Sequence, residues 1–262
     1  TPRGKRVTGG EVVRSHLRHR RFGSAASAIF SKVPTGASSR MALLEKLKEK
    51  ISGISIPLYK TKWSDYSREE VDLSKYDEWI VKRKTACDVI AKLRPKTLLD
   101  IGSNTGWFSK LASMFGSLPV ATDNDETCIN KLYLGEKEYS HNILPLVMDF
   151  RKPTPAHGIG LRCDPAVDRF RCEMVLGLAI VHHLTFKQNL KFEDIVGSLQ
   201  AFAEKWLLAE FIPKEDKYVS EWYNESYSWY TADNFEAELK RYFPKVDRLP
   251  SNPKPRMMFI CE

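Results

Sequence analysis

Short apolar runs alternate with helical stretches through the last two thirds of the chain. The apolar runs predict strands at residues 97–101, 119–123, 143–149, 174–181, 206–212 and 256–261. Helical periodicity between these runs predicts helices at residues 107–116, 125–139, 189–205 and 231–242. Strands that alternate with helices of about 10–15 residues are typical of a mostly parallel sheet with helices on both faces. The pattern therefore predicts an α/β fold.

The first 95 residues lack this alternation. Helical periodicity is present there in three stretches, at residues 11–30, 41–51 and 76–93. In the second stretch, the apolar side chains expected to face inward are Leu43, Leu44, Leu47 and Ile51. An aromatic and irregular segment around Lys62, Trp63, Asp65 and Tyr66 precedes the third stretch. We predict three parts: a basic helical extension (1–60), an aromatic lid or linker with a helix (61–95) and an α/β core (96–262).

Composition narrows the class of protein. With 262 residues and 42% hydrophobic side chains, the chain can bury a sizeable core. No apolar run approaches the roughly 18 residues of a membrane span, so we expect no membrane insertion. The five cysteines form an odd number without a CxxC pair, which argues against a disulfide scaffold and a structural zinc site. We therefore expect an intracellular, cytoplasmic protein without a metal, although import into an organelle stays open.

The net charge of +8 belongs to the N-terminal segment. Residues 1–40 hold nine Lys or Arg and one acid, and the rest of the chain holds 32 basic and 32 acidic residues. A basic arm can bind the phosphates of RNA, or it can be a solvated or packed extension of a larger polypeptide. The Ser, Ala and Gly content also resembles a transit peptide. Because the first residue is Thr, we expect a processed form or a piece of a longer polypeptide.

Acidic side chains end three successive predicted strands: Asp100, Asp123 and Asp149. The first is followed by the glycine turn GSNTG at residues 102–106. Ligands of open α/β sheets lie at this edge, where a carboxylate can bind both ribose hydroxyls. A dinucleotide would need GxGxxG, and its pyrophosphate would be repelled by Asp100. A cationic nucleoside without phosphate, S-adenosylmethionine, suits this set of residues better.

These segments resemble the class I S-adenosylmethionine-dependent methyltransferases. LLDIGSNTGWFSKLA is similar to their motif I, VATDND to motif II and LVMDF to the adenine-binding segment. The resemblance implies a Rossmann-like, seven-stranded, mostly parallel sheet whose last strand, here RMMFIC, is antiparallel. It implies contacts of Gly102, Ser103 and Gly106 with the methionine end near Asp100, of Asp123 with the ribose, and of Asp149 and Phe150 with the adenine.

Candidate catalytic residues follow the fourth and fifth predicted strands. His182 and His183 are neighbours, and an imidazole near neutral pKa can deprotonate a hydroxyl or an amine. Their alternative role is to shape the pocket, and Glu210 is the second candidate for the base. Lys214 and Asp216 follow at the expected rim, where Asp216 is expected to be solvated. Together with Asn189, this region resembles a bacterial-type subgroup related to nodulation or surface glycans.

The resulting hypothesis is a methyltransferase core behind a helical extension. The expected acceptor is an oxygen or nitrogen atom of a small molecule or a glycan. One alternative is an RNA methyltransferase that residues 1–40 anchor to its substrate. Another is a methyltransferase fold that binds without catalysis, which the intact Gly102, Gly106 and Asp123 argue against.

Overall fold

The computed structural model describes residues 36–54, 59–64, 70–139 and 141–262. The chain divides into two compact units, residues 1–57 and 58–262. In the first unit the described element is helix α3 (Ala37–Ser52), which has no buried residue. Leu44, Leu47 and Ile51 are exposed, although the pattern predicted that they face inward. The reason is that no other described element of this unit covers them.

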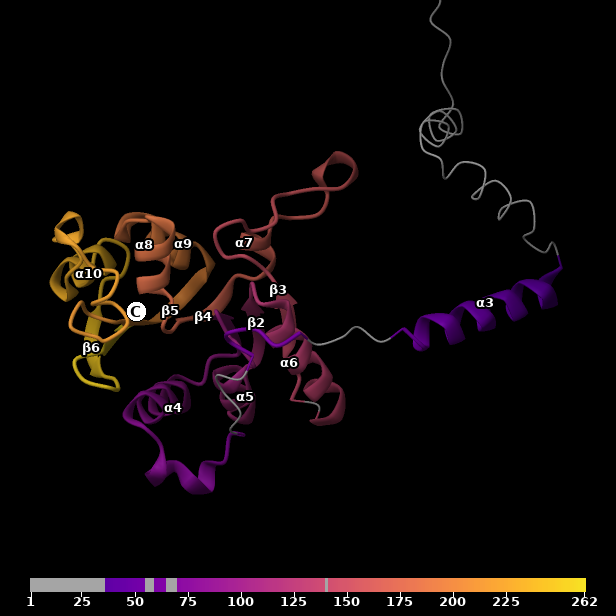
Figure 1. Ribbon diagram of the computed structural model, residues 1–262, viewed down its shortest axis with the longest axis horizontal. Coiled ribbons are helices and arrows are strands. Elements are labelled where there is room, and N and C mark those ends of the chain that lie inside the picture. The colour runs from indigo at the N-terminus through magenta and orange to yellow at the C-terminus, as the bar shows by residue number, and fades with distance from the viewer. Residues whose placement is uncertain (1–35, 55–58, 65–69, 140) are drawn as a thin grey trace, which may run out of the picture. The chain divides into compact units, whose positions relative to one another are not determined.

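The second unit is built on a seven-stranded sheet with the order β3-β2-β1-β4-β5-β7-β6 (Figure 1). The strands are β1 (Thr97–Ile101), β2 (Leu118–Asp123), β3 (Leu144–Val147), β4 (Cys172–Gly177), β5 (Ala203–Phe211), β6 (Val246–Pro250) and β7 (Met257–Cys261). Strand β7 runs antiparallel to both of its neighbours, and the pairs among β1 to β5 are parallel. This arrangement confirms the predicted fold class and the antiparallel last strand.

Helices cover both faces of the sheet (Figure 1). Those of eight or more residues are α4 (Val81–Leu93), α5 (Trp107–Met114), α6 (Glu126–Tyr139), α8 (Val181–Gln188), α9 (Phe192–Phe202) and α10 (Ala232–Leu239). The shorter ones are η1 (Leu73–Glu78), η2 (Ile159–Leu161), α7 (Ala166–Arg169) and η3 (Glu225–Tyr227). Among the described residues, none of the helices combines the length and apolar character that a membrane crossing needs.

The two faces follow from the alternation of side chains along each strand. In β1, Leu98 packs in a cluster with residues of α4 and α5, whereas Leu99 packs in a cluster with residues of α8, α9 and α10. In β5, Leu208 belongs to the same cluster as Leu98, and Leu207 belongs to the same cluster as Leu99. Because strands buried on both faces need apolar side chains in both directions, these strands read as continuous apolar runs.

The structure differs from the predicted elements at several places, and the helix predicted at 189–205 already ends at Phe202, where β5 follows. Residues 178–181 were predicted as the end of a strand, but β4 ends at Gly177 and Val181 begins α8. A continuous apolar run does not separate a buried strand from a buried helix start, and Val181 is fully buried. The helix predicted at 76–93 is two helices, η1 and α4. Strand β6 was not predicted, because VDRLP has no continuous apolar run and ends in a proline, which is tolerated in an edge strand.

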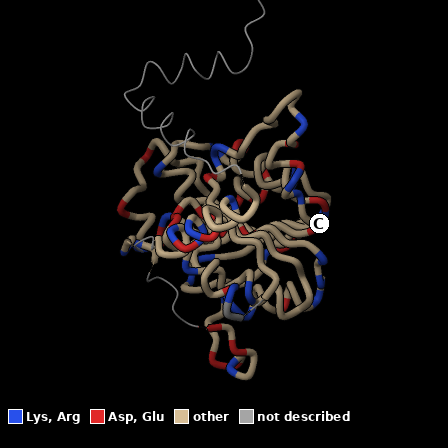
Figure 2. The backbone as a smooth tube through the Cα atoms, turned by 90° about the vertical axis from the view of Figure 1, so that its right-hand side faces the viewer, with Lys and Arg blue, Asp and Glu red and all other residues tan. Residues whose placement is uncertain are grey.

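Basic and acidic residues are interspersed along the described backbone (Figure 2). Most of the basic arm, residues 1–35, lies outside the described residues. The RNA-binding prediction for this arm and the division of the chain at residues 60 and 95 therefore stay predictions. Helix α4 nevertheless packs into the second unit, since Ala86, Cys87 and Ile90 are buried against the sheet.

Candidate methyl-transfer site

The glycine turn after β1 needs two glycines for steric reasons. Gly102 has a φ of 73° and donates a 2.8 Å hydrogen bond to the Thr122 carbonyl. A Cβ atom at this position would lie 2.6 Å from Cγ2 of Ile180. Gly106 has a φ of 79°, and a Cβ there would lie 2.7 Å from Cδ2 of Leu132. Glycine alone combines an easily adopted positive φ with the absence of a Cβ atom. The two glycines therefore let the loop lie against β2 and let α5 begin directly after the turn.

Asp123 ends β2 and faces the glycine turn. Its Oδ2 accepts a 2.8 Å hydrogen bond from the Asn104 amide, and its Oδ1 accepts a 2.9 Å bond from the Asp125 amide. Burial raises the pKa of Asp123, and these backbone donors oppose that shift. Each carboxylate oxygen keeps a further lone pair. The carboxylate is thus fixed in orientation and still able to accept two hydroxyl donors.

Asp100 lies beneath the same turn and is almost completely buried. Its Oδ2 accepts a 2.7 Å hydrogen bond from the Ser109 hydroxyl of α5. Burial raises the pKa of Asp100 to about 6, a shift that the Ser109 hydrogen bond opposes. A cation bound nearby would stabilise the ionised form of this carboxyl.

The third acid, Asp149, follows β3 and is engaged by Arg151. Arg151 Nε donates to Oδ1 at 2.9 Å, and Nη2 donates to Oδ2 at 2.6 Å. Hydrogen bonding to Arg151 lowers the pKa of Asp149. The neighbouring Phe150 packs on the core, with its ring centroid 6.2 Å from that of Phe202. The adenine contacts expected for Asp149 and Phe150 stay a prediction.

The residues around the turn fit S-adenosylmethionine. The Ser103 hydroxyl oxygen is buried and has no hydrogen-bond partner among the described residues. A buried hydroxyl without a partner is costly, and a polar ligand group would satisfy it. Together with Asp123, this hydroxyl offers the polar contacts that a nucleoside with an amino-acid tail requires. The glycines at 102 and 106 let this turn pack closely against Ile180 and Leu132, which holds Ser103 in place.

Beside the glycine turn, two histidines at the start of α8 contact two tryptophans. The rings of His182 and His183 lie 4.1 Å apart between centroids. The ring of Trp63 meets that of His183 edge-on at 5.4 Å, and Trp222 lies 5.4 Å from His183 on another side. The Trp63 carbonyl accepts a 2.9 Å hydrogen bond from Asn104 Nδ2, which ties this segment to the glycine turn.

The two histidines differ in basicity. Burial lowers the pKa of His182 to about 2, and neighbouring positive groups including Arg256 lower it further. Burial also lowers the pKa of His183, followed by the charges of Lys62 and Lys187. Both rings are therefore neutral at pH 7, and His183 is more exposed than His182. No hydrogen bond joins either ring to another described residue.

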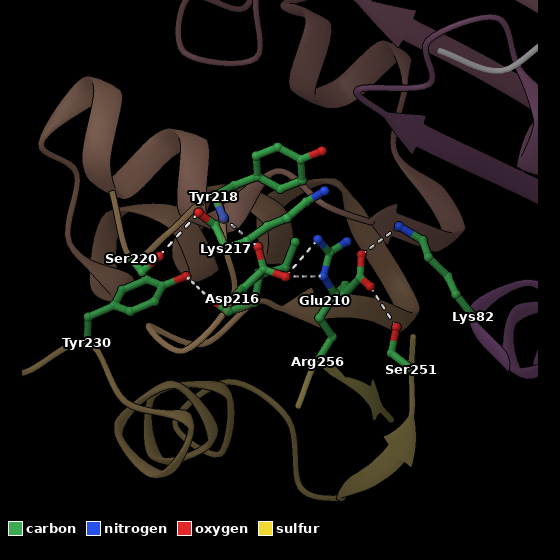
Figure 3. Close-up of polar contacts among 10 residues, drawn as sticks. Lys82, Glu210, Asp216, Lys217, Tyr218, Ser220, Tyr230, Ser251 and Arg256 are labelled. Carbon is green, nitrogen blue, oxygen red and sulfur yellow. Dashed lines mark hydrogen bonds and ion pairs between the residues drawn. The ribbon is translucent and has the colours of Figure 1, made fainter. Parts of the chain in front are cut away.

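Glu210 is completely buried at the end of β5 and carries two strong hydrogen bonds (Figure 3). Lys82 Nζ donates to Oε2 at 2.6 Å, and Ser251 Oγ donates to Oε1 at 2.6 Å. These bonds join α4, β5 and the segment after β6. The sequence indicated Glu210 but neither of its partners, because a lysine inside a predicted helix and a serine in a loop carry no distinct pattern.

A second buried ion pair lies close to the first (Figure 3). Arg256 Nε donates to Asp216 Oδ2 at 2.8 Å, and Asp216 is only 4% exposed. The expectation that Asp216 is solvated is therefore not met, because Arg256 compensates its charge. Lys214 is exposed and lies over the Tyr223 ring at 5.0 Å. Trp222 was also missed, although the aromatic density of SEWYNESYSWY was an available signal.

This sheet order, with the glycine turn at its reversal point, defines the fold of the class I S-adenosylmethionine-dependent methyltransferases. The resemblance of the sequence motifs to that class is confirmed. Among solved structures, the chain is similar to "bifunctional kinase-methyltransferase WbdD", with a TM-score of 0.51, 15% identity, and coverage of 82% of this chain and 46% of that chain. A second structure of WbdD matches with a TM-score of 0.51 and 14% identity, over 82% of this chain and 46% of that one.

Among curated proteins, the chain is similar to nodulation protein NoeA of Rhizobium meliloti (strain 1021). The two are 31% identical over 181 residues, which are 68% of this chain and 37% of NoeA. The chain thus spans less than half the length of either relative. No protein-family model matches the sequence.

Proposed function

We propose that this chain is an S-adenosylmethionine-dependent methyltransferase that acts on an oxygen or nitrogen atom of a small molecule or a glycan. The observation that carries the proposal is Asp123, which backbone donors orient across the glycine turn, beside the unsatisfied Ser103 hydroxyl. The similarity of the fold to WbdD supports the proposal. The histidines and tryptophans that follow next to this pocket form the acceptor end.

Each group of the chain has a separate task in this proposal. When bound, the cofactor supplies an electrophilic methyl group. Asp123 binds the ribose hydroxyls, and Ser103 binds the amino-acid tail. His183 is neutral and accepts the proton of the acceptor at a ring nitrogen, since it is the more exposed of the two histidines. Proximity and a positioned base are the main contributions of the protein to the rate.

Glu210 has a positioning role in this proposal rather than that of the base. Both of its oxygens are occupied by Lys82 and Ser251, and the carboxylate has no exposed surface. A ring-containing acceptor is supported by Trp63 and Trp222, because aromatic faces bind the apolar faces of rings.

Calorimetry with S-adenosylmethionine and with its demethylated product tests the proposal. The parent chain is expected to bind both at micromolar levels. Asp123→Ala is expected to weaken binding by about 1–3 kcal/mol, since a charge-assisted hydrogen-bond acceptor is lost. Asp164→Ala removes an exposed acid elsewhere and serves as the matched control, with unchanged affinity expected. A parent chain that binds neither ligand refutes the proposal.

Thermal unfolding of each variant separates lost binding from lost folding. Asp123→Asn keeps the shape and removes the charge, so it is expected to retain the fold and lose affinity. Cofactor binding without methyl transfer to any acceptor would instead support the non-catalytic alternative.

A further inference from the structure

Two lysines flank His183, and neither has an acidic partner among the residues that the structure describes. The ammonium groups of Lys62 and Lys187 lie over tryptophans whose rings contact His183, and both charges lower the pKa of His183. No ion pair or hydrogen bond joins either ammonium to another residue of the described part of the chain. Lys187 lies one helical turn after His183 in α8, on the same face.

Deeper cations next to the histidines are compensated instead. Lys82 pairs with Glu210 at 2.6 Å, and Arg256 pairs with Asp216 at 2.8 Å. Both acids are buried, as is required where a cation leaves water. The contrast is therefore local: Lys82 and Arg256 are each paired with a buried acid, whereas the two lysines next to His183 have no acid within the described residues.

Each of the two uncompensated lysines lies over a tryptophan. Lys62 Nζ is 5.1 Å from the centroid of Trp63, and Lys187 Nζ is 4.0 Å from that of Trp222. The same two tryptophans contact the His183 ring. Three segments of the chain thus bring a ring-binding surface and a positive charge to one place, next to the base of the proposed reaction.

We propose that the methyl acceptor is an acidic saccharide: a hydroxyl-bearing ring that carries an anionic group. Its ring packs on the tryptophans, and its anion interacts with Lys62 and Lys187. This inference rests on the proposed function, because His183 marks an acceptor end only if a methyl group is delivered there. A carboxylate and a phosphate share the required charge, so the test includes both.

Ligand-observed NMR titrations in saturating demethylated cofactor test the inference. The probes are trigalacturonate with its neutral methyl ester, and glucose 6-phosphate with glucose. We expect at least one anionic probe to bind about tenfold or more tightly than its neutral counterpart at low salt, because unscreened charges attract it. The preferred probe identifies the anion. Equal affinity for charged and neutral probes in both pairs overturns the inference.

The double variant Lys62→Glu, Lys187→Glu locates the site. It is expected to lose the preference for the anionic probe while it keeps the affinity for the demethylated cofactor. Lys48→Glu, Lys92→Glu changes the net charge equally at two exposed lysines and is expected to keep the preference. If both double variants lose it equally, general attraction explains the binding and the inference fails. A parent chain that binds no cofactor refutes the proposed function and with it the acceptor role, whereas a retained anion preference in that chain would still locate an anion-binding site at the two lysines.

Discussion

Lys82 and Glu210, 128 residues apart in the chain, share a 2.6 Å ion pair in which the carboxylate has no exposed surface. The pair joins the first turn of α4 to the end of β5, next to the histidines. Helix α4 therefore belongs to the structural support of the site, although it precedes the segments that resemble the methyltransferase motifs.

Removal of one partner of this pair is expected to be strongly destabilising. Glu210→Ala leaves the Lys82 ammonium without its acid, and a broken buried pair typically costs about 3–5 kcal/mol of unfolding free energy. The double variant Lys82→Met, Glu210→Leu replaces both charges by apolar groups and is expected to recover much of this loss. Denaturant unfolding of the single and double variants measures the coupling.

Lys245→Met removes an exposed cation that pairs with Glu262 and serves as the control. It is expected to change stability little, since exposed pairs contribute little. If Glu210→Ala is no more destabilising than this control, the pair does not support the site.

A methyl group at Gly102 is expected to disturb the cofactor pocket. Gly102→Ala combines a positive φ with a Cβ contact of 2.6 Å to Ile180. Gly116→Ala is a matched control, because Gly116 also has a positive φ but no atom within 4 Å of the added Cβ. Gly116→Ala is expected to lose about 1–2 kcal/mol of stability from backbone strain, and Gly102→Ala is expected to lose more, because the contact with Ile180 adds to the same strain. Only Gly102→Ala is expected to lose affinity for the demethylated cofactor, as measured by calorimetry.

The clash itself is tested with a second substitution. Ile180→Ala removes the Cγ2 atom that the new methyl group would meet, so Gly102→Ala, Ile180→Ala is expected to bind better than Gly102→Ala. No recovery would show that backbone strain, and not the contact with Ile180, accounts for the loss.

Asp100 is expected to make stability depend on pH. Its pKa in the folded state is about 6, above the ordinary value of 3.8, because the carboxyl is buried. The folded state thus holds the proton more tightly, and stability decreases as pH rises from about 4 to 6. This difference between the folded and the ordinary pKa of Asp100 corresponds to about 3 kcal/mol of unfolding free energy. Above pH 6.5 this contribution is constant.

The measurement is the unfolding free energy of the parent and of Asp100→Asn between pH 4 and pH 7. The asparagine does not titrate, so its stability relative to the parent is expected to increase across this range. A difference that stays constant with pH would show that Asp100 has an ordinary pKa in the folded state.

The glycine turn and the strand-end acids could be predicted from the sequence because they are local. Strand β1 has the bounds that were predicted, 97–101, since five residues between Lys96 and the first glycine leave little choice. Asp123 faces the turn because adjacent parallel strands end at one edge of the sheet. Both features follow from the spacing of apolar residues along the chain and from the parallel order of the strands.

The surroundings of His183, the proposed acceptor end, could not be predicted in the same way. Lys187 is one helical turn from His183 in α8, but Lys62 and Trp222 come from two other segments, and only the tertiary fold brings them to this ring. Nor does the sequence show that Arg256 compensates Asp216, because a pair 40 residues apart has no local pattern. Burial, which distinguishes His182 from His183, is also a tertiary property.

His183 is expected to be the base, and His182 to shape the pocket. Burial lowers the pKa of His182 to about 2, so this ring is a very weak proton acceptor. The pKa of His183 is also lowered, so its neutral form predominates above pH 6.5 and the rate is expected to fall only below that pH. Once an acceptor is known, His183→Ala is expected to reduce the single-turnover rate by about 10²–10⁴-fold.

His182→Ala is the matched control for this prediction and is expected to have the smaller effect on the rate. Cofactor affinity is expected to stay within about a factor of ten in both variants, because base and cofactor contacts are separate. NMR titration of the two rings, assigned with His182→Gln and His183→Gln, checks the basicity independently of activity. If His183 titrates above pH 6.5, or if both alanine variants keep the parent rate, Glu210 or the acceptor itself must take the proton.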